Sequence, residues 1–273
     1  MRWKIATTWM FMFLAIRLPI VCAQEGPWQR AMKTGTHAYE HCDFDRAERE
    51  FAIAAKAATQ FDLGDTRLVV TLVAGGRTFG AQGKYERAER ALKRGLAISE
   101  SWLGPEHPKT AEALNTLGLL YIHWQKQDQA ESALRRSLEI REKVFGPESQ
   151  EVAESLTGLA ELALNGNRWS NAEPLLKRSL AILQQTLAPG DPGLIATMDD
   201  LAILYSRQGH HAQAETYYRA TLEIIEKNFG RNYCELVPIL QNYSELMRET
   251  GRDADADELQ ARAYDIAAKE MKP

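Results

Sequence analysis

With 273 residues, 45% of them hydrophobic and 26% charged, the chain has the composition of a folded globular protein. Its formal net charge of −4 argues against a nucleic-acid-binding protein, because phosphate backbones require a basic surface. Three cysteines are too few for a disulfide framework, so burial of apolar side chains must stabilise the fold.

Residues 1–23 have the features of a secretory signal peptide. A basic start precedes an apolar stretch at 5–16, and a small-residue cleavage site ends at Ala23. Only twelve apolar residues precede Arg17, whereas a membrane-spanning helix needs roughly 20. We therefore predict cleavage after Ala23 and export to the periplasm or the exterior; an N-terminal anchor through residues 5–23 is the alternative. Cleavage removes three basic residues and no acidic ones, so the net charge of the mature chain, 24–273, changes from −4 to −7.

The rest of the chain repeats with a period of 42 residues. An alanine followed by an acidic residue recurs first after 41 residues and then at steps of 42. These pairs begin at Ala47, Ala88, Ala130, Ala172, Ala214 and Ala256. A second series, also 42 apart, consists of Phe61, Leu103, Phe145, Leu187 and Phe229. Two series in the same register indicate structural repeats.

Each unit contains two apolar runs with helical spacing, separated by a short polar turn. In the third unit these runs occupy 111–121 and 130–145. The turn residue is often glycine or asparagine, as at Gly83 and Asn167, which suits the left-handed backbone that ends a helix. The pattern predicts a helical hairpin in each unit. Because one hairpin cannot bury its apolar faces alone, we expect an all-α solenoid of stacked hairpins.

Small residues on both helices and an aromatic residue late in the first helix resemble the tetratricopeptide repeat. The 42-residue step and the segments LGPEHPKTAEALNTLGLLY, 103–121, and QGKYERAERALKRGLAI, 82–98, are similar to the kinesin light chain variety. The resemblance covers about 28–270 and implies a right-handed solenoid of about six helix-turn-helix units. Their expected bounds are about 28–64, 65–106, 107–148, 149–190, 191–232 and 233–270.

The resemblance also implies a peptide-binding groove. In this family the inner faces of the first helices form a concave surface for peptides or partner proteins. The residue after the first leucine of each unit should face this groove; these are Asn115, Thr157, Asp199 and Gln241, with Val73 at the start of the row. A second row one turn further on contains the charged residues Arg77, Glu161 and Glu245. The alternative for the first row is that its polar residues are merely solvated helix surface.

Asn115 matches the asparagine that contributes to cargo-peptide binding in kinesin light chains. The residues at the other three positions differ from asparagine, so the peptide preference of that family does not transfer to this chain.

The sequence offers little evidence for catalysis. His37 and His41 have the spacing for a shared metal ion on a helix, but no third ligand is fixed by spacing, so we predict no metal and no cofactor. There is no phosphate-binding glycine loop and no nucleophile elbow. Cys42 and Cys234 lie about ten helices apart in an open stack of helices packed about 8–10 Å apart, so we expect no disulfide between them.

The sequence therefore predicts a non-catalytic scaffold or adaptor of the bacterial cell envelope or exterior that binds another protein or a peptide. Two other classes stay open. One is a self-assembling structural subunit of an envelope complex, and the other, less favoured, is a metal-dependent enzyme built on His37 and His41.

Overall fold

The structure is a computed structural model that describes residues 26–62 and 64–270. The predicted signal or anchor segment, 1–23, lies outside these residues. The described part contains twelve α-helices, one short 3-10 helix and no strand. None of these helices is both long and apolar enough to cross a membrane.

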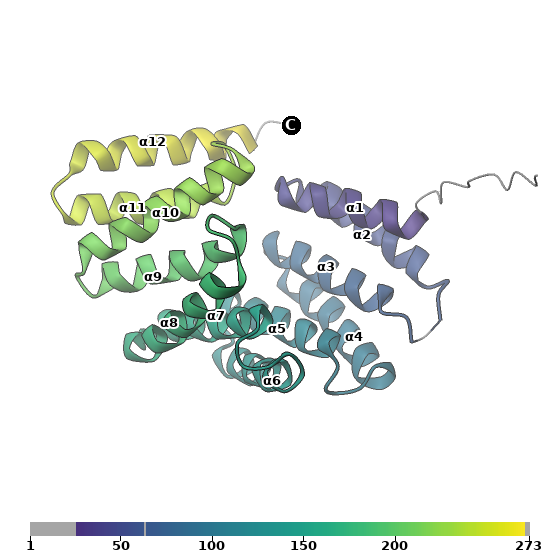
Figure 1. The fold of residues 1–273 in the computed structure, drawn as a ribbon. Helices are drawn as coiled ribbons and strands as arrows, with labels where there is room; N and C mark the ends of the chain where they lie inside the picture. The colour runs from purple at the N-terminus through teal and green to yellow at the C-terminus, as the bar shows by residue number, and fades with distance from the viewer. Residues whose placement is uncertain (1–25, 63, 271–273) are drawn as a thin grey trace, which may run out of the picture.

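The helices pair in chain order into six hairpins, which confirms the predicted all-α solenoid (Figure 1). The pairs are α1 (Pro27–Glu40) with α2 (Phe44–Ala58), α3 (Arg67–Ala81) with α4 (Tyr85–Trp102), α5 (Pro108–His123) with α6 (Gln127–Phe145), α7 (Gln150–Asn165) with α8 (Trp169–Thr186), α9 (Ile195–Arg207) with α10 (His211–Phe229), and α11 (Leu236–Glu249) with α12 (Asp253–Glu270). The 3-10 helix η1 (Pro192–Leu194) precedes α9.

Every hairpin turn contains one residue with a left-handed backbone at the same place in the repeat. Glycine occupies this place in three turns, and the six residues are Cys42, Gly83, Gln125, Asn167, Gly209 and Gly251. The amide of the following residue donates back to a carbonyl of the first helix, for example from Lys126 to Tyr121 at 2.8 Å. This arrangement satisfies carbonyls that the end of a helix leaves unpaired.

Within a hairpin, a small residue of the first helix packs against a large residue of the second. A Cβ atom placed on Gly76 would lie 2.5 Å from Cγ of Leu92, and one on Gly118 would lie 2.5 Å from Cγ of Leu134. Leu92 and Leu134 are both fully buried. The two helices can therefore approach this closely only because a glycine has no side chain.

The odd-numbered helices line the inner side of the stack. Among the described residues, the odd-numbered helices of successive units contact one another, whereas the even-numbered helices of successive units do not. The first helices of the hairpins are therefore closer together than the second helices, and the stack bends toward them. Figure 1 shows this bend, from α1 and α2 through α5 to α8 and round to α11 and α12.

The bend continues until the two ends of the stack meet. Cys42, in the turn between α1 and α2, and Cys234, just before α11, form a disulfide with Cα atoms 6.5 Å apart. The prediction that these cysteines stay unpaired is wrong because it treated the stack as open. In the described structure no helix of the first unit contacts α11 or α12, so the ends meet through their connecting segments.

We expect this disulfide to stabilise the closed ring. It joins residues 192 positions apart, and removing it by Cys42→Ser should lower the free energy of unfolding by roughly 2–5 kcal/mol, because the unfolded chain gains the entropy of a large loop. Chemical denaturation of oxidised wild type, reduced wild type and Cys42→Ser measures this difference, and reductant should not change the variant further. Intact mass under non-reducing conditions should show a monomer two hydrogens lighter than the dithiol; a dithiol monomer from an oxidising preparation would contradict the closure.

Candidate functional site

Two neighbouring hollows lie on the inner side of the ring. We call the first, of 670 Å³, the central hollow; it extends over α3, α5, α7 and α9 and contains Arg77, Asn115, Thr157 and Glu161. The second, of 630 Å³, shares Thr157 and Glu161 and adds Asp199; we call it the acidic hollow. The structure thus brings five of the seven predicted groove residues to one surface, which we call the inner groove.

The predicted row changes from buried to exposed along the stack. Val73 is 2% exposed, Asn115 7% and Thr157 9%, Asp199 is half-buried, and Gln241 is exposed. Gln241 and the exposed Glu245 lie on α11, which no later unit covers, and neither lines either hollow. A ligand that contacts them must extend to the end of the stack.

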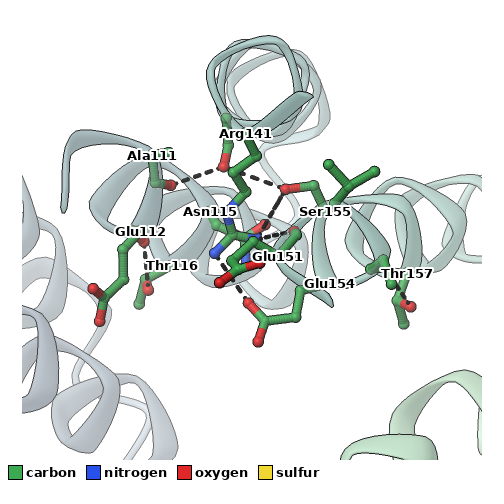
Figure 2. Close-up of polar contacts among 12 residues, drawn as sticks. Ala111, Glu112, Asn115, Thr116, Arg141, Glu151, Glu154, Ser155 and Thr157 are labelled. Carbon is green, nitrogen blue, oxygen red and sulfur yellow. Dashed lines mark hydrogen bonds and ion pairs between the residues drawn. The ribbon is translucent and has the colours of Figure 1, made fainter. Parts of the chain in front are cut away.

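Asn115 both lines the central hollow and connects two units. Its Oδ1 accepts a hydrogen bond from the Ser155 hydroxyl at 3.4 Å, which links α5 to α7 (Figure 2). The side chain is buried, so it is part of the packed inner wall and not a freely solvated residue. The Asn115 side chain is therefore already held in one orientation before any ligand contacts it.

Arg141 is a functional candidate that the sequence analysis missed. Its side chain comes from α6, is buried, and donates to the Glu151 carbonyl at 2.7 Å and to the Ser155 hydroxyl and Glu154 Oε2 at 3.0 Å (Figure 2). The equivalent residues of other units are Ser99, Leu183 and Ile225. At this position of the repeat the other units have uncharged residues, and this difference could have identified Arg141 from the sequence. Arg141 fixes the Glu154 carboxylate at the edge of the central hollow.

The Thr157 hydroxyl is already used within the protein. It contacts Ala153 O at 3.1 Å, Ser179 Oγ at 2.9 Å and Thr197 Oγ1 at 2.8 Å. These hydroxyls belong to a series of buried hydroxyl groups between successive units. The series lies where the second helix of one unit packs against the first helix of the next unit. The Thr157 hydroxyl thus contributes to the packing between units, and its predicted role in ligand binding stays a prediction.

The hydroxyl series ends at the last unit. Ser137 contacts Ser155 at 3.3 Å, and Ser179 contacts Thr197 at 3.1 Å, one unit further along. The next pair would be Thr221 with the residue 42 positions after Thr197, which is Ile239. Isoleucine has no hydroxyl, and Thr221 Oγ1 is buried without a hydrogen-bond partner.

Three carboxyl groups lie together in the acidic hollow, and each of them has a raised pKa. Burial raises the pKa of Asp199 to about 6, and burial together with the charges of Glu161 and Asp199 raises the pKa of Asp200 well above its usual value. Burial also raises the pKa of Glu161, which His123 partly offsets; His123 Nε2 lies 3.9 Å from Glu161 Oε1. The sequence analysis selected Asp199 and Glu161 but not Asp200.

The predicted histidine pair lies away from both hollows. The rings of His37 and His41 are 4.1 Å apart at the end of α1, and His41 Nδ1 is 2.8 Å from the His37 carbonyl oxygen. Among the described residues, no three His, Cys, Asp or Glu side chains lie together in a way that could hold a metal ion.

The repeat pattern matches a known family. The model of the tetratricopeptide repeat matches residues 71–143, 122–185, 151–227 and 194–269, which together cover well over half of the chain. The chain belongs to the tetratricopeptide repeat family. No curated protein matches the sequence of this tetratricopeptide repeat protein.

Solved structures share its fold at low sequence identity. BtubC (BKLC) from P. vanneervenii is 17% identical, with 91% of this chain and 94% of that chain covered and a TM-score of 0.60. A Podosopora anserina kinesin light chain with nearly identical TPR-like repeats is 22% identical over 76% and 98%, with a TM-score of 0.54. A Rap protein complexed with Competence and Sporulation Factor is 12% identical over 89% and 75%, with a TM-score of 0.67. The predicted kinesin light chain-like repeats are thus confirmed, and these similarities concern the fold alone.

Two identical substitutions test whether the buried hydroxyl series stabilises this repeat stack. Thr157→Val removes hydroxyl contacts to two helices and should cost about 1 kcal/mol, the usual net value of a hydrogen bond. Thr221→Val removes a buried hydroxyl that has no partner, so it should leave stability unchanged or raise it. Denaturant unfolding of both variants measures the difference; equal losses would mean that the hydroxyl pairing between units contributes nothing.

Proposed function

We propose that the chain is a non-catalytic scaffold of the bacterial cell envelope or exterior that binds an extended segment of a partner protein along its inner groove. The observation that carries this proposal is the central hollow, which continues over four successive first helices. Equivalent residues 42 positions apart become neighbours there, one unit apart in space. Such a ladder suits a ligand that is itself a repeating chain.

The chemistry of the central hollow favours a polypeptide ligand. Its wall combines the amide of Asn115, the cationic groups of Arg77 and Lys109, and the carboxylate of Glu112. Amide side chains offer both donors and an acceptor, which a peptide backbone requires. Binding of proteins is typical of this repeat family, and the similar Rap structure was solved with Competence and Sporulation Factor.

Two observations support a location outside the cytosol. Residues 1–23 have the sequence features of a signal peptide. The disulfide between Cys42 and Cys234 is of a kind that persists mainly in oxidising compartments such as the periplasm.

A substitution inside the groove tests the binding role. Ala196 is exposed and lines both hollows, so Ala196→Arg should place a long side chain in the groove without disturbing the core. Capture of a partner from envelope extract by the tagged mature chain should fall strongly, because the added arginine occupies the volume that the ligand needs. Quantitative mass spectrometry of the captured proteins measures the change.

The same substitution on the outer side is the matched control. Ala212 is an exposed alanine of α10 that lines neither hollow, and Ala212→Arg should capture the partner as the wild type does. Undiminished capture by Ala196→Arg, with both variants folded by circular dichroism, would show that the partner uses another surface.

The N-terminus of the mature protein tests the compartment. We expect it to be Gln24, because the small-residue site ends at Ala23. N-terminal sequencing of protein from the native host decides this. An intact Met1 in the membrane fraction would favour the anchor through residues 5–23 instead.

A further inference from the structure

The acidic hollow contains two half-buried carboxyl groups, Asp199 and Asp200, that form no ion pair within the described part of the chain. Glu161 comes from α7, Asp199 and Asp200 come from α9, and Trp169 at the start of α8 contributes an aromatic wall. Asp199 Oδ1 is fully covered and accepts no hydrogen bond. In the described residues the side chain of Asp200 forms no hydrogen bond or ion pair, and the side chain of Glu161 has only the 3.9 Å approach of His123.

Acidic residues on the second helices of the hairpins form ion pairs. The glutamate of the repeated alanine-acidic pair contacts a lysine or arginine in each of the first five units, and these contacts hold its pKa below the usual value. These residues are Glu48, Glu89, Glu131, Glu173 and Glu215. The fold therefore supplies a cationic partner for each of these five glutamates and supplies none for Asp199 and Asp200.

Half-buried carboxylates without an ion pair attract a cation more strongly than carboxylates in bulk water do. The arrangement does not suit a metal ion, because no group of three or more possible ligands converges anywhere in the described part of the chain. An organic cation fits better, since its donors can reach the carboxyl groups that line the hollow while its apolar stem packs on Trp169.

We propose that the acidic hollow binds an arginine or lysine side chain of the partner and so makes the inner groove selective for basic segments. This inference rests on the proposed function, because the basic side chain belongs to the segment that lies in the groove. It assigns Asp199 and Asp200 the main role, with Glu161 beside them. Arg207 also lines the hollow but forms no ion pair with any of the three carboxylates.

Binding of a small basic peptide tests the inference directly. The probe is acetyl-Ala-Arg-Ala-amide, and its neutral control carries citrulline, which keeps the shape of arginine without the charge. Titration of the oxidised mature chain, followed by amide chemical shifts in NMR, should give saturable shifts in α7 and α9 with the arginine peptide only. Asp200→Asn should weaken this binding roughly tenfold, as expected for loss of a charge-assisted contact.

The pH dependence gives a second readout. The titratable and charged groups that line the hollow are Asp199, Asp200, Glu161, His123 and Arg207, and Tyr218 of α10 interacts electrostatically with Asp199. Because the pKa of Asp199 is about 6, its carboxyl takes up a proton as the pH falls through 6, and the affinity for the arginine peptide should fall with it. Asp199→Asn should flatten this part of the profile. The matched control Asp265→Asn, on the exposed side of α12, should change neither the affinity nor its pH dependence.

The outcomes separate this inference from the proposed function. Equal binding of the arginine and citrulline peptides, or no shift up to the solubility limit, overturns the inference. If partner capture is then still abolished by Ala196→Arg and unaffected by Asp199→Asn and Asp200→Asn, the groove binds a partner without basic selectivity. If Ala196→Arg captures the partner normally while the arginine peptide binds, the hollow is a cation site and the proposed groove function fails.

Discussion

The architecture depends on the contact between a small residue of each first helix and a large residue of each second helix. Gly35 with Phe51, Gly76 with Leu92, and Gly118 with Leu134 form this contact in the first three units. The equivalent residues of the next two units are Ala160 with Leu176 and Ala202 with Tyr218, all buried. In the last unit the pair is Ser244 and Gln260, joined by a hydrogen bond of 3.2 Å. One contact repeated in this way gives every hairpin nearly the same shape.

Because the hairpins have nearly the same shape, the stack of hairpins curves. Each unit is rotated relative to the one before it, and equal small rotations add in the same direction. The first helices therefore gather on one side, where they form the inner groove, and the ends of the stack approach each other. The disulfide between Cys42 and Cys234 joins the ends where helix packing does not. The groove and the closed ring thus have the same origin.

The local features of this fold could be predicted from sequence, because they depend on residues close together in the chain. The 42-residue period, the helical spacing of apolar residues and the turn glycines indicated six hairpins. The closure could not be predicted in this way, since it depends on the sum of rotations over the whole stack, and no local pattern encodes that sum. The expected absence of a disulfide failed for this reason.

The inner groove was predictable in position but not in detail. The repeat register identified Asn115, Thr157 and Asp199, and the structure places all three along the hollows. Register alone could not show that the Thr157 hydroxyl is taken up by Ser179 and Thr197, because those contacts join different units. It also missed Asp200, whose significance depends on which charges surround it in space.

The distribution of charge links stability to binding in this protein. Exposed ion pairs are worth little individually, so the paired outer glutamates contribute mainly solubility and a small stabilisation. Asp199 and Asp200 act in the opposite direction, because a half-buried carboxylate without an ion pair disfavours the folded state once it is ionised. The central units can offset this loss of stability, since each packs against neighbouring units on both sides. A cation bound at the acidic hollow would relieve the cost, so ligand binding and folding stability should increase together.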